Sequence, residues 1–358
     1  MAARLRGVAP HRILDFSANI NPLGPSRKAL ERLRRDLPLI RFYPDAETRE
    51  LRELIAKKTG IDGDCILFGN GATPLLHLIP RVLKPRKALI IEPGFSEYSA
   101  ALEQANCHIQ RLLLRPETGF QLDREALFDT LRRARPDFLI LGNPNNPTGN
   151  VVPRRLLAEL VDTCSKRGIY LVVDESFLDF TSHPSRAVDA TKRPRLIVVR
   201  SLTKFWALAG LRIGYLVGRK RLVEKLFENL EPWSVNTLAS AAAAESLRDH
   251  KYRDRTLNLV RRERAFLTKR LAGLGWLEPL PSETNFLLVR ITAPGITSAQ
   301  LCERLAEKNI LLRDGSSFAG LGSRYFRVAI RRRSENQRLV EELSSLSPIV
   351  AHRARRSR

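Results

Sequence analysis

Short apolar runs alternate with amphipathic stretches through the middle of this chain. The runs, which have the length and β-branched content of buried strands, cover residues 88–91, 138–141, 170–173, 196–199 and 215–217. Stretches such as residues 154–166 lie between them, with apolar positions at helical spacing. Strands that alternate with helices predict an α/β fold, in which helices cover a mostly parallel sheet.

From about residue 232 the pattern changes to one of long helices. It predicts a helix over residues 238–271, broken by Gly273 and Gly275, and then a strand at 285–290, a helix at 298–308 and a strand at 327–330. At 358 residues the chain exceeds the usual size of a single core, so we expect two domains. We place a large domain at 42–237, a linking helix with a small α+β domain at 238–350, and a disordered basic tail at 351–358.

The first candidate for chemistry is a lysine close after the run at 196–199. Ser201, Thr203 and Lys204 follow that run, and Arg212 lies eight residues further on. Ligands of α/β sheets gather where parallel strands end. Two hydroxyl groups, a lysine and an arginine are what a Schiff-base lysine beside a cofactor phosphate requires, and a solvated surface lysine is the alternative.

Three further polar segments also follow strand-like runs. Asp174 and Glu175 end the run at 170–173, where an acidic residue can pair with a protonated pyridine nitrogen. Residues 143–149, Asn-Pro-Asn-Asn-Pro-Thr-Gly, follow the run at 138–141 and are too rich in turn residues to be anything but a shaped loop. Residues 69–73, Gly-Asn-Gly-Ala-Thr, precede a helical stretch whose first N–H groups favour a phosphate.

Composition narrows the classes of partner. The chain has 61 basic and 38 acidic residues, a net charge of +23, which is a pointer to nucleic acid. The arginines are spread in small groups and no DNA- or RNA-binding motif is present, so we expect a basic surface without a specific nucleic-acid partner. No apolar run reaches the ~20 residues of a membrane span. The four cysteines lack metal-ligand spacing, so we expect no metal and a cytoplasmic location.

The segments GNGAT, NPNNPTG, VVDES, SLTK and LRIGY together resemble fold-type I pyridoxal 5′-phosphate (PLP) enzymes of the class I/II aminotransferase superfamily. The resemblance runs from about Leu14 to about Leu339. It implies PLP as cofactor, a large PLP-binding domain, and an N-terminal segment, residues 1–41, that packs with the small domain. A PLP-fold regulator that binds nucleic acid is an alternative supported only by the charge.

The same resemblance implies roles in binding PLP. Lys204 would hold the cofactor and Asp174 would pair with its ring nitrogen, with the adjacent Glu175 as the competitor for that role. Asn146 would donate to the ring's phenolic oxygen, and Phe95 would stack on the ring, with Tyr98 as the fallback. The residues that would hold the cofactor phosphate are Ala72, Thr73, Ser201, Thr203 and Arg212.

Tyr43 is implied to reach the cofactor phosphate of the neighbouring subunit, which makes the active enzyme at least a homodimer. The alternative for Tyr43 is a tyrosine of the core.

Segments at residues 15–24, 93–98, 232–236 and 324–331 resemble enzymes of this superfamily that act on phosphorylated substrates. The implied reaction is decarboxylation of L-threonine O-3-phosphate to (R)-1-amino-2-propanol O-2-phosphate, a step of cobalamin assembly. Transamination of histidinol phosphate and decarboxylation of serine phosphate are the alternatives. Asn19 and Asn146 would contact the substrate, Arg327 would bind its carboxylate and Arg313 its phosphate. The alternative for each of these arginines is a solvated surface charge.

Two departures from the superfamily pattern bear on the reaction. Its aminotransferases usually place a tyrosine three residues after the pyridinium acid, but here that residue is Phe177, which favours decarboxylation. The decarboxylases also carry a His-Gly-Gly motif ahead of the segment at 15–24, and this sequence does not contain it. Either the motif belongs to residues ahead of the start of this sequence, or another group closes the pocket, with His11 as a candidate.

Overall fold

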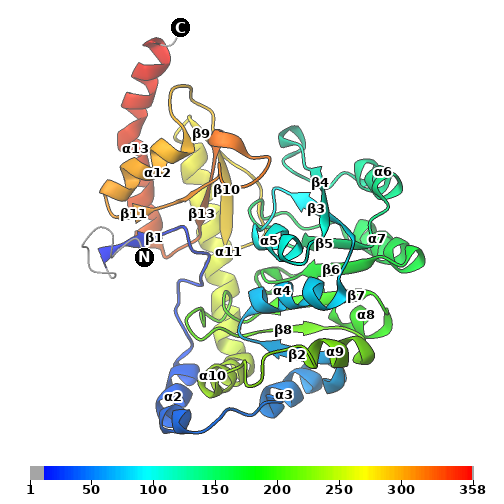
Figure 1. Cartoon of the computed structure of the whole chain (residues 1–358). Helices are drawn as coiled ribbons and strands as arrows, with labels where there is room; N and C mark the ends of the chain where they lie inside the picture. Colours follow the sequence, from blue (N-terminus) through cyan, green and yellow to red (C-terminus); the bar gives the residue numbers. More distant parts are fainter. Residues whose placement is uncertain (1–11, 357–358) are drawn as a thin grey trace.

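The structure, a computed structural model of the chain, describes residues 12–356 (Figure 1). A large unit surrounds a seven-stranded sheet, and a smaller unit with its own sheet lies beside it. Helix α11 (His250–Ala272) runs between the two units. His11, the candidate for closing the pocket, lies outside the described residues.

The large sheet has the strand order β2-β8-β7-β6-β5-β3-β4. Its strands are β2 (Ile66–Gly69), β3 (Lys87–Glu92), β4 (His108–Leu113), β5 (Phe138–Gly142), β6 (Tyr170–Asp174), β7 (Leu196–Ser201) and β8 (Gly214–Val217). Strands β4, β3, β5, β6 and β7 are parallel neighbours, and β8 runs antiparallel to both β7 and β2. The predicted α/β fold with a mostly parallel sheet is confirmed.

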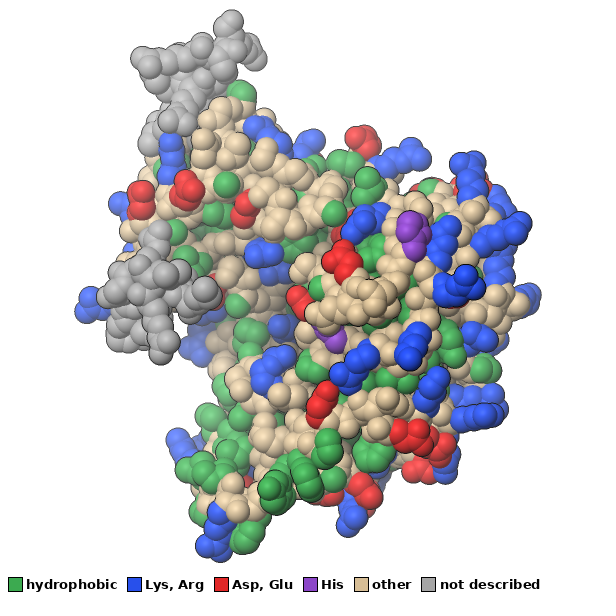
Figure 2. Space-filling model, viewed as in Figure 1, with side chains coloured by type: hydrophobic (Ala, Val, Ile, Leu, Met, Phe, Trp, Pro, Cys, Tyr) green, Lys and Arg blue, Asp and Glu red, His purple; other side chains and the backbone are tan. Residues whose placement is uncertain are grey.

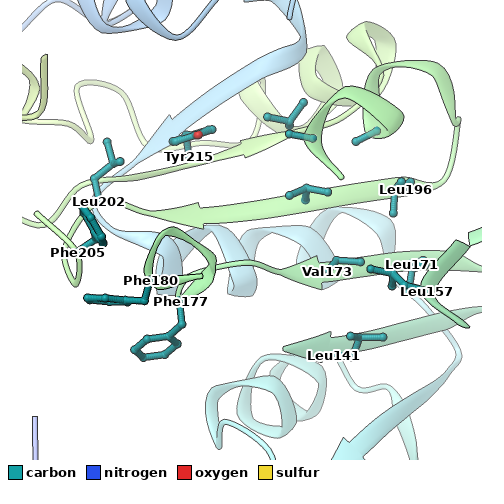
Figure 3. Close-up of a cluster of buried hydrophobic side chains, with 14 of the residues drawn as sticks. Leu141, Leu157, Leu171, Val173, Phe177, Phe180, Leu196, Leu202, Phe205 and Tyr215 are labelled. Atoms are coloured by element: carbon teal, nitrogen blue, oxygen red, sulfur yellow. The ribbon is translucent and has the colours of Figure 1, made fainter. Parts of the chain in front are cut away.

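Helices cover both faces of this sheet because its strand residues are apolar on both sides. Leu141, Leu171 and Val173 belong to a core cluster under α6 and α7 (Figure 3), whereas Ile140 and Val172 face α4, α5 and α9. Buried parallel strands read as continuous apolar runs for this reason. The helices of this unit are α4 (Ala72–Leu83), α5 (Glu97–Gln104), α6 (Arg124–Ala134), α7 (Arg154–Arg167), α8 (Ala187–Lys192), α9 (Lys220–Phe227) and α10 (Thr237–Arg248).

The smaller unit is built on an antiparallel sheet of order β12-β13-β10-β9. Its elements are β9 (Leu277–Pro279), β10 (Phe286–Ile291), α12 (Ser298–Glu307), β11 (Ile310–Leu311), β12 (Arg313–Asp314), β13 (Tyr325–Ala329) and α13 (Arg333–Arg356). Phe16, Leu287 and Phe326 are fully buried in the separate core of this unit. Single-turn 3-10 helices lie at Gly63–Cys65, Pro116–Thr118, Leu178–Phe180 and Gly322–Arg324.

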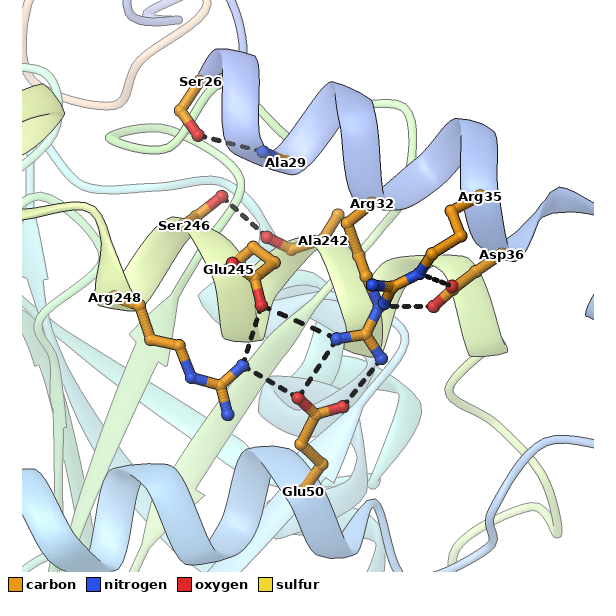
Figure 4. A network of polar contacts seen from close by, with 10 residues as sticks. All are labelled: Ser26, Ala29, Arg32, Arg35, Asp36, Glu50, Ala242, Glu245, Ser246 and Arg248. Carbon is orange, nitrogen blue, oxygen red and sulfur yellow. Dashed lines mark hydrogen bonds and ion pairs between the residues drawn. The ribbon is translucent and has the colours of Figure 1, made fainter.

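The N-terminal segment contacts both units. β1 (Leu14–Asp15) pairs in parallel with β11 of the smaller unit, whereas α2 (Arg27–Asp36) packs on α10. The single-turn helix Leu37–Arg41 and then α3 (Arg49–Thr59) follow α2. A polar network joins the three helices, with Glu50 of α3 accepting from Arg32 of α2 at 3.0 Å and from Arg248 of α10 at 2.8 Å (Figure 4). The domain boundaries given above stay a prediction.

The helix predicted over residues 238–271 is in fact two helices, α10 and α11. Asp249 separates them with φ −89° and ψ 78°, and its side chain accepts from the backbone N–H of Tyr252 at 3.0 Å. The break has a local cause, because an aspartate at this position can cap a new helix. The apolar period continues across Asp249 and hides the break in the sequence. α13 extends to Arg356, into the segment predicted as a basic tail.

Candidate active site

A cavity of about 230 Å³ lies at the carboxyl ends of β5, β6 and β7, between the large sheet and β13 of the smaller unit. Its charged lining residues are Asp174, Lys204, Arg212 and Arg327. The other predicted site residues that line it are Asn19, Ala72, Thr73, Phe95, Asn146, Ser201 and Thr203. The chain therefore brings together lining residues that are up to 310 positions apart in the sequence.

Lys204 lies three residues after β7 and is partly buried. Burial lowers the pKa of its amine, and the positive charges of Arg212 and Arg327 lower it further, while Asp174 acts in the opposite direction. Removing the charged form from water and placing cations nearby both favour a neutral amine. A neutral amine is the form that attacks a carbonyl carbon.

Asp174, the last residue of β6, faces the cavity. Its Oδ2 accepts from the Tyr98 hydroxyl at 2.8 Å, and its Oδ1 accepts from the backbone N–H of Ser176 at 2.9 Å. The pKa of Asp174 is raised because the carboxyl is buried, although the Ser176 and Tyr98 hydrogen bonds and the charge of Lys204 counteract this. A cation brought to this carboxylate would stabilise its charged form.

Glu175, the sequence competitor of Asp174, lies on the other side of the strand end. It forms an ion pair with Arg200 at 2.9 Å and accepts from the backbone N–H of Arg186 at 2.8 Å. Successive residues of a strand point to opposite faces, so only one of two adjacent acids can face the cavity. Glu175 is absent from the cavity lining and already has a cation of its own.

The start of α4 and the loop after β7 form an anion cradle. Gly71 caps α4 with φ +96°, and a Cβ at this position would lie 2.4 Å from Nη2 of Arg212. The hydroxyls of Ser201 and Thr203 lie 2.6 Å apart. N–H groups at a helix start, two hydroxyls and a guanidinium are donors that suit a phosphate. A side chain at this position would displace the Arg212 guanidinium, and the positive φ also favours glycine.

The loop at residues 143–149 places Asn146 beside the cavity. The Asn146 side-chain oxygen accepts from Nη1 of Arg327, which connects the large unit to β13. Phe95 lines the cavity and meets Tyr98 edge-to-face at a centroid distance of 5.7 Å. Because the Tyr98 hydroxyl donates to Asp174, this tyrosine has a contact that sequence reasoning did not identify.

Arg327 is only 8% exposed, and its partners are all uncharged. Nη2 donates to the carbonyl of Ser17 at 2.7 Å. With its amide oxygen turned toward the guanidinium, Asn19 accepts from Nε at 3.3 Å and from Nη1 at 3.2 Å. Burial, followed by the nearby charge of Arg313, lowers the pKa of Arg327. Within residues 12–356 this arginine forms no ion pair with a carboxylate, so an anionic ligand would supply the missing charge.

Two predicted site residues, Arg313 and Tyr43, lie outside the cavity lining. Arg313 pairs across the β12–β13 register with Arg327, is exposed, and donates from Nη2 to Ser317 Oγ at 3.0 Å. Tyr43 is 81% exposed and packs against Trp233, with the two rings tilted and their centroids 4.7 Å apart. Its exposure excludes the alternative of a core tyrosine within this chain.

The lining also includes residues that sequence reasoning missed as site residues. Phe177, noted in the sequence as the replacement for the usual aminotransferase tyrosine, lines the cavity and packs edge-to-face on Phe286 at a centroid distance of 5.0 Å. The cavity therefore has an apolar ring at the position where aminotransferases usually have a tyrosine hydroxyl. The missed residues are Ser17, Ala18, Leu76, Pro144 and Ser176. Ser176 had a recognisable signal, because a serine two residues after an aspartate can close a turn onto that carboxylate.

These features define a PLP-enzyme type of site, and the comparisons agree. The model of the family described as aminotransferase class I and II matches residues 11–343, so the chain belongs to this family. It is 40% identical to a threonine-phosphate decarboxylase of Salmonella typhimurium, over 98% of this chain and 95% of that protein. It is 30% identical to a histidinol-phosphate aminotransferase of Methanopyrus kandleri, over 95% of this chain and 89% of that protein.

A solved structure of L-threonine-O-3-phosphate decarboxylase from Porphyromonas gingivalis is similar with a TM-score of 0.82 and 29% identity. The likeness covers 93% of this chain and 99% of that one. The predicted fold type is thus confirmed. PLP, the cofactor expected from the sequence, is the cofactor of this family of enzymes, whose members are typically dimers.

Within residues 12–356 no helix is both long and apolar enough to cross a membrane. The same residues contain no group of three or more histidine, cysteine or acidic side chains arranged to hold a metal ion.

Proposed function

We propose that this chain decarboxylates L-threonine O-3-phosphate to (R)-1-amino-2-propanol O-2-phosphate, with PLP as cofactor, as a step of cobalamin assembly. The observation that carries the proposal is the 40% identity to a threonine-phosphate decarboxylase over 98% of the chain, against 30% to a histidinol-phosphate aminotransferase. Phe177 in the cavity supports the same reaction.

The cavity residues fit PLP. The cradle that a Cβ at Gly71 would fill, with Arg212 beside it, suits the cofactor phosphate. Lys204 would hold the cofactor covalently, Asp174 would pair with its ring nitrogen, and Asn146 would donate to its phenolic oxygen. Phe95 would stack on the ring. The remaining phosphate partners would be Ala72, Thr73, Ser201 and Thr203.

For the substrate, the buried guanidinium of Arg327 would bind the α-carboxylate, and Asn19 and Asn146 would help to orient it. A forked arginine suits a carboxylate because it can donate two parallel hydrogen bonds. Arg313, on the neighbouring strand, would bind the phosphate of the substrate. These contacts would orient the substrate and so determine which bond at Cα breaks, which would favour decarboxylation over transamination.

PLP supplies an electron sink for the bond that breaks at Cα. Asp174 would keep that sink effective by stabilising the protonated ring nitrogen. Breaking the Cα–carboxylate bond would release carbon dioxide and leave its electron pair at Cα, where the bound cofactor would delocalise it. Lys204 then delivers a proton to Cα, and the substrate's phosphate group leaves unchanged with the amine product.

The proposal is tested by measuring carbon dioxide release from threonine phosphate and serine phosphate, and glutamate formation from histidinol phosphate with 2-oxoglutarate. We expect threonine phosphate to be the preferred substrate, with no release by a Lys204→Ala variant. Glutamate formation faster than carbon dioxide release would contradict the proposal and favour the aminotransferase. Serine phosphate differs by one methyl group, which is worth only about 1–3 kcal/mol in a pocket, so both decarboxylations belong in one experiment.

The enzyme would act as a homodimer in which exposed Tyr43 reaches the cofactor phosphate of the partner subunit. Mixing two inactive variants tests this arrangement. A heterodimer of Lys204→Ala and Tyr43→Ala subunits would contain one intact site, because the lysine and the tyrosine of that site come from different chains. We expect mixing to restore activity. No recovery, with heterodimers demonstrated by differently tagged subunits, would show that Tyr43 serves its own chain.

A further inference from the structure

The edge of the large sheet opposite the cavity carries an arginine on each of five adjacent strands. Arg86, Arg135, Arg167 and Arg195 come within three residues before β3, β5, β6 and β7, and Arg219 comes two residues after the antiparallel β8. All five side chains are exposed. We call this row of five arginines the basic edge. Figure 2 shows Lys and Arg side chains gathered on this side of the molecule, with fewer acidic ones.

The basic edge is linear because the strands that carry it are neighbours in the order β8-β7-β6-β5-β3. With strands about 4.8 Å apart, four intervals extend the row over roughly 19 Å. Duplex nucleic acid rises about 3.4 Å per base pair, so the row matches about six base pairs. Lys84, Lys166, Lys192 and Arg221 are exposed beside it and widen the positive field.

In the described part of the chain no carboxylate neutralises the arginines of the basic edge, although the Arg195 guanidinium lies over the Tyr170 ring at 4.7 Å from its centroid. Within the described residues none of the five arginines forms an ion pair with a carboxylate. Nearby acids have other partners: Asp162 pairs with Arg193 at 2.7 Å and Asp64 with Lys220 at 2.6 Å, while Asp137 accepts from backbone N–H groups. Glu224 of α9 and Glu228, the residue that follows this helix, are exposed close to Arg219 and, together with Asp137, are the main opposing charges.

A role in ending helices explains only part of the row. Helices α4, α6, α7 and α8 end at this edge, and basic side chains in a last turn favour the helix dipole. Arg167 has such a position, but Arg86 and Arg195 lie outside every helix and Arg219 precedes one, where a positive charge is unfavourable. Arg195 has a contact with the Tyr170 ring, so Arg86 and Arg219 are the two arginines that need another explanation.

The composition of the edge favours a phosphodiester backbone over other anionic partners. No exposed large apolar side chain lies in the segments that carry the five arginines; most lie over residues 30–43 and at Trp233. Protein interfaces have apolar and aromatic centres, and stable membrane anchoring requires a second signal besides basic charge. Backbone contacts to nucleic acid require only cations, and arginine suits phosphate because its donors are forked.

We propose that the basic edge binds the phosphate backbone of duplex nucleic acid without regard to sequence. This inference is independent of the proposed reaction, because the edge lies at the opposite ends of the strands from the cavity. Docked in this way, the protein keeps its cavity open to small molecules.

The test uses PLP-saturated protein and a fluorescently labelled duplex of about 20 base pairs, with anisotropy followed between 50 and 200 mM salt. The edge variant combines Arg135→Gln, Arg167→Gln and Arg219→Gln. The control removes the same charge from α11 with Arg255→Gln, Arg261→Gln and Arg270→Gln, all exposed. Because each phosphate contact contributes a slope of about 0.9 in log Kd against log salt, we expect the edge variant to lower the slope by about 2 to 3.

We also expect the edge variant to weaken binding at 50 mM salt at least tenfold, the control variant to change it less than twofold, and both to retain decarboxylation. If both variants weakened duplex binding equally, net charge alone would explain the effect and the proposal would be overturned. A more than tenfold difference in Kd between two unrelated duplex sequences would also overturn it. Binding to phosphatidylserine vesicles provides a further comparison, made at the same phosphate concentration as the duplex. If the protein bound the vesicles more tightly than the duplex, and the edge variant lost this binding, the partner of the basic edge would be a membrane surface instead of nucleic acid.

Discussion

The hydroxyl of Tyr98 is the donor whose removal tests the role of Asp174 most directly. It donates to Asp174 Oδ2 at 2.8 Å from a position that is only 4% exposed. Substitution by phenylalanine keeps the ring and its edge-to-face contact with Phe95 and deletes one hydrogen bond to a buried carboxylate. Hydrogen bonds to charged groups contribute about 1.5–3 kcal/mol. If Asp174 must be ionised in the transition state, Tyr98→Phe should lower kcat by roughly 10- to 150-fold.

The pH dependence of kcat tests whether Tyr98 lowers the pKa of Asp174. Burial already raises the pKa of Asp174, and the Tyr98 hydroxyl lowers it by stabilising the charged form. Activity that needs the carboxylate is present above its pKa and lost as the pH falls through it. Without the hydroxyl the pKa is higher, so we expect the acid limb of kcat to move to higher pH in Tyr98→Phe.

The assay is carbon dioxide release from threonine phosphate across the pH range at saturating cofactor. Ser176→Ala, which deletes a different donor to the same carboxylate, should move the limb in the same direction. Tyr325→Phe, a buried tyrosine outside the cavity, is the matched control and should leave the limb unchanged. An unchanged acid limb in both Tyr98→Phe and Ser176→Ala would refute the assignment of Asp174 as the ionised partner of the ring.

Three more predictions concern the cavity. Gly71→Ala should weaken PLP binding at least tenfold in an absorbance titration, because the new Cβ would lie 2.4 Å from Arg212. Gly24→Ala is the control, since Gly24 also has a positive φ but no atom lies within 4 Å of the new Cβ, and this variant should bind PLP normally. Arg327→Ala should lower kcat/KM about 100-fold or more through the loss of two charged hydrogen bonds, and a loss below tenfold would contradict its role at the carboxylate. Phe177→Tyr should increase the fraction of turnovers that end in transamination, measured as ketone per carbon dioxide; an unchanged ratio would remove Phe177 from the argument on reaction type.

Much of the cavity could be predicted because its residues follow strand ends. Asp174 ends β6, and Ser201 ends β7 with Lys204 three residues later, so apolar runs in the sequence already placed these groups at one edge of a parallel sheet. Because successive strand residues point to opposite faces, the sequence could also have predicted that only one of Asp174 and Glu175 faces the cavity. Motif resemblance supplied the more distant members, such as Asn19 and Arg327, which no local pattern connects.

Other features depend on long-range packing that no local period encodes. The contact between Tyr98 and Asp174 joins residues 76 positions apart, on a helix and on a strand. Arg313 and Arg327 are direct partners in the β12–β13 register, yet Arg313 on the edge strand β12 is exposed whereas Arg327 on the inner strand β13 is buried, a difference that the sequence does not show. The break between α10 and α11 at Asp249 was missed because one aspartate within an apolar period is a weak signal.

The charges of the cavity connect the cofactor site to the substrate site. Lys204, Arg212 and Arg327 face the single carboxylate of Asp174, and the two arginines lower the pKa of the lysine. An anion bound at Arg212 or at Arg327 would offset the charge of that arginine and so raise the pKa of Lys204. The cofactor phosphate at Arg212 and the substrate carboxylate at Arg327 would therefore each make this amine a better carrier of the proton that Cα later receives. Inorganic phosphate should accordingly compete with PLP for the apoprotein, and this competition should weaken in Arg212→Gln; equal competition in both proteins would place the anion elsewhere.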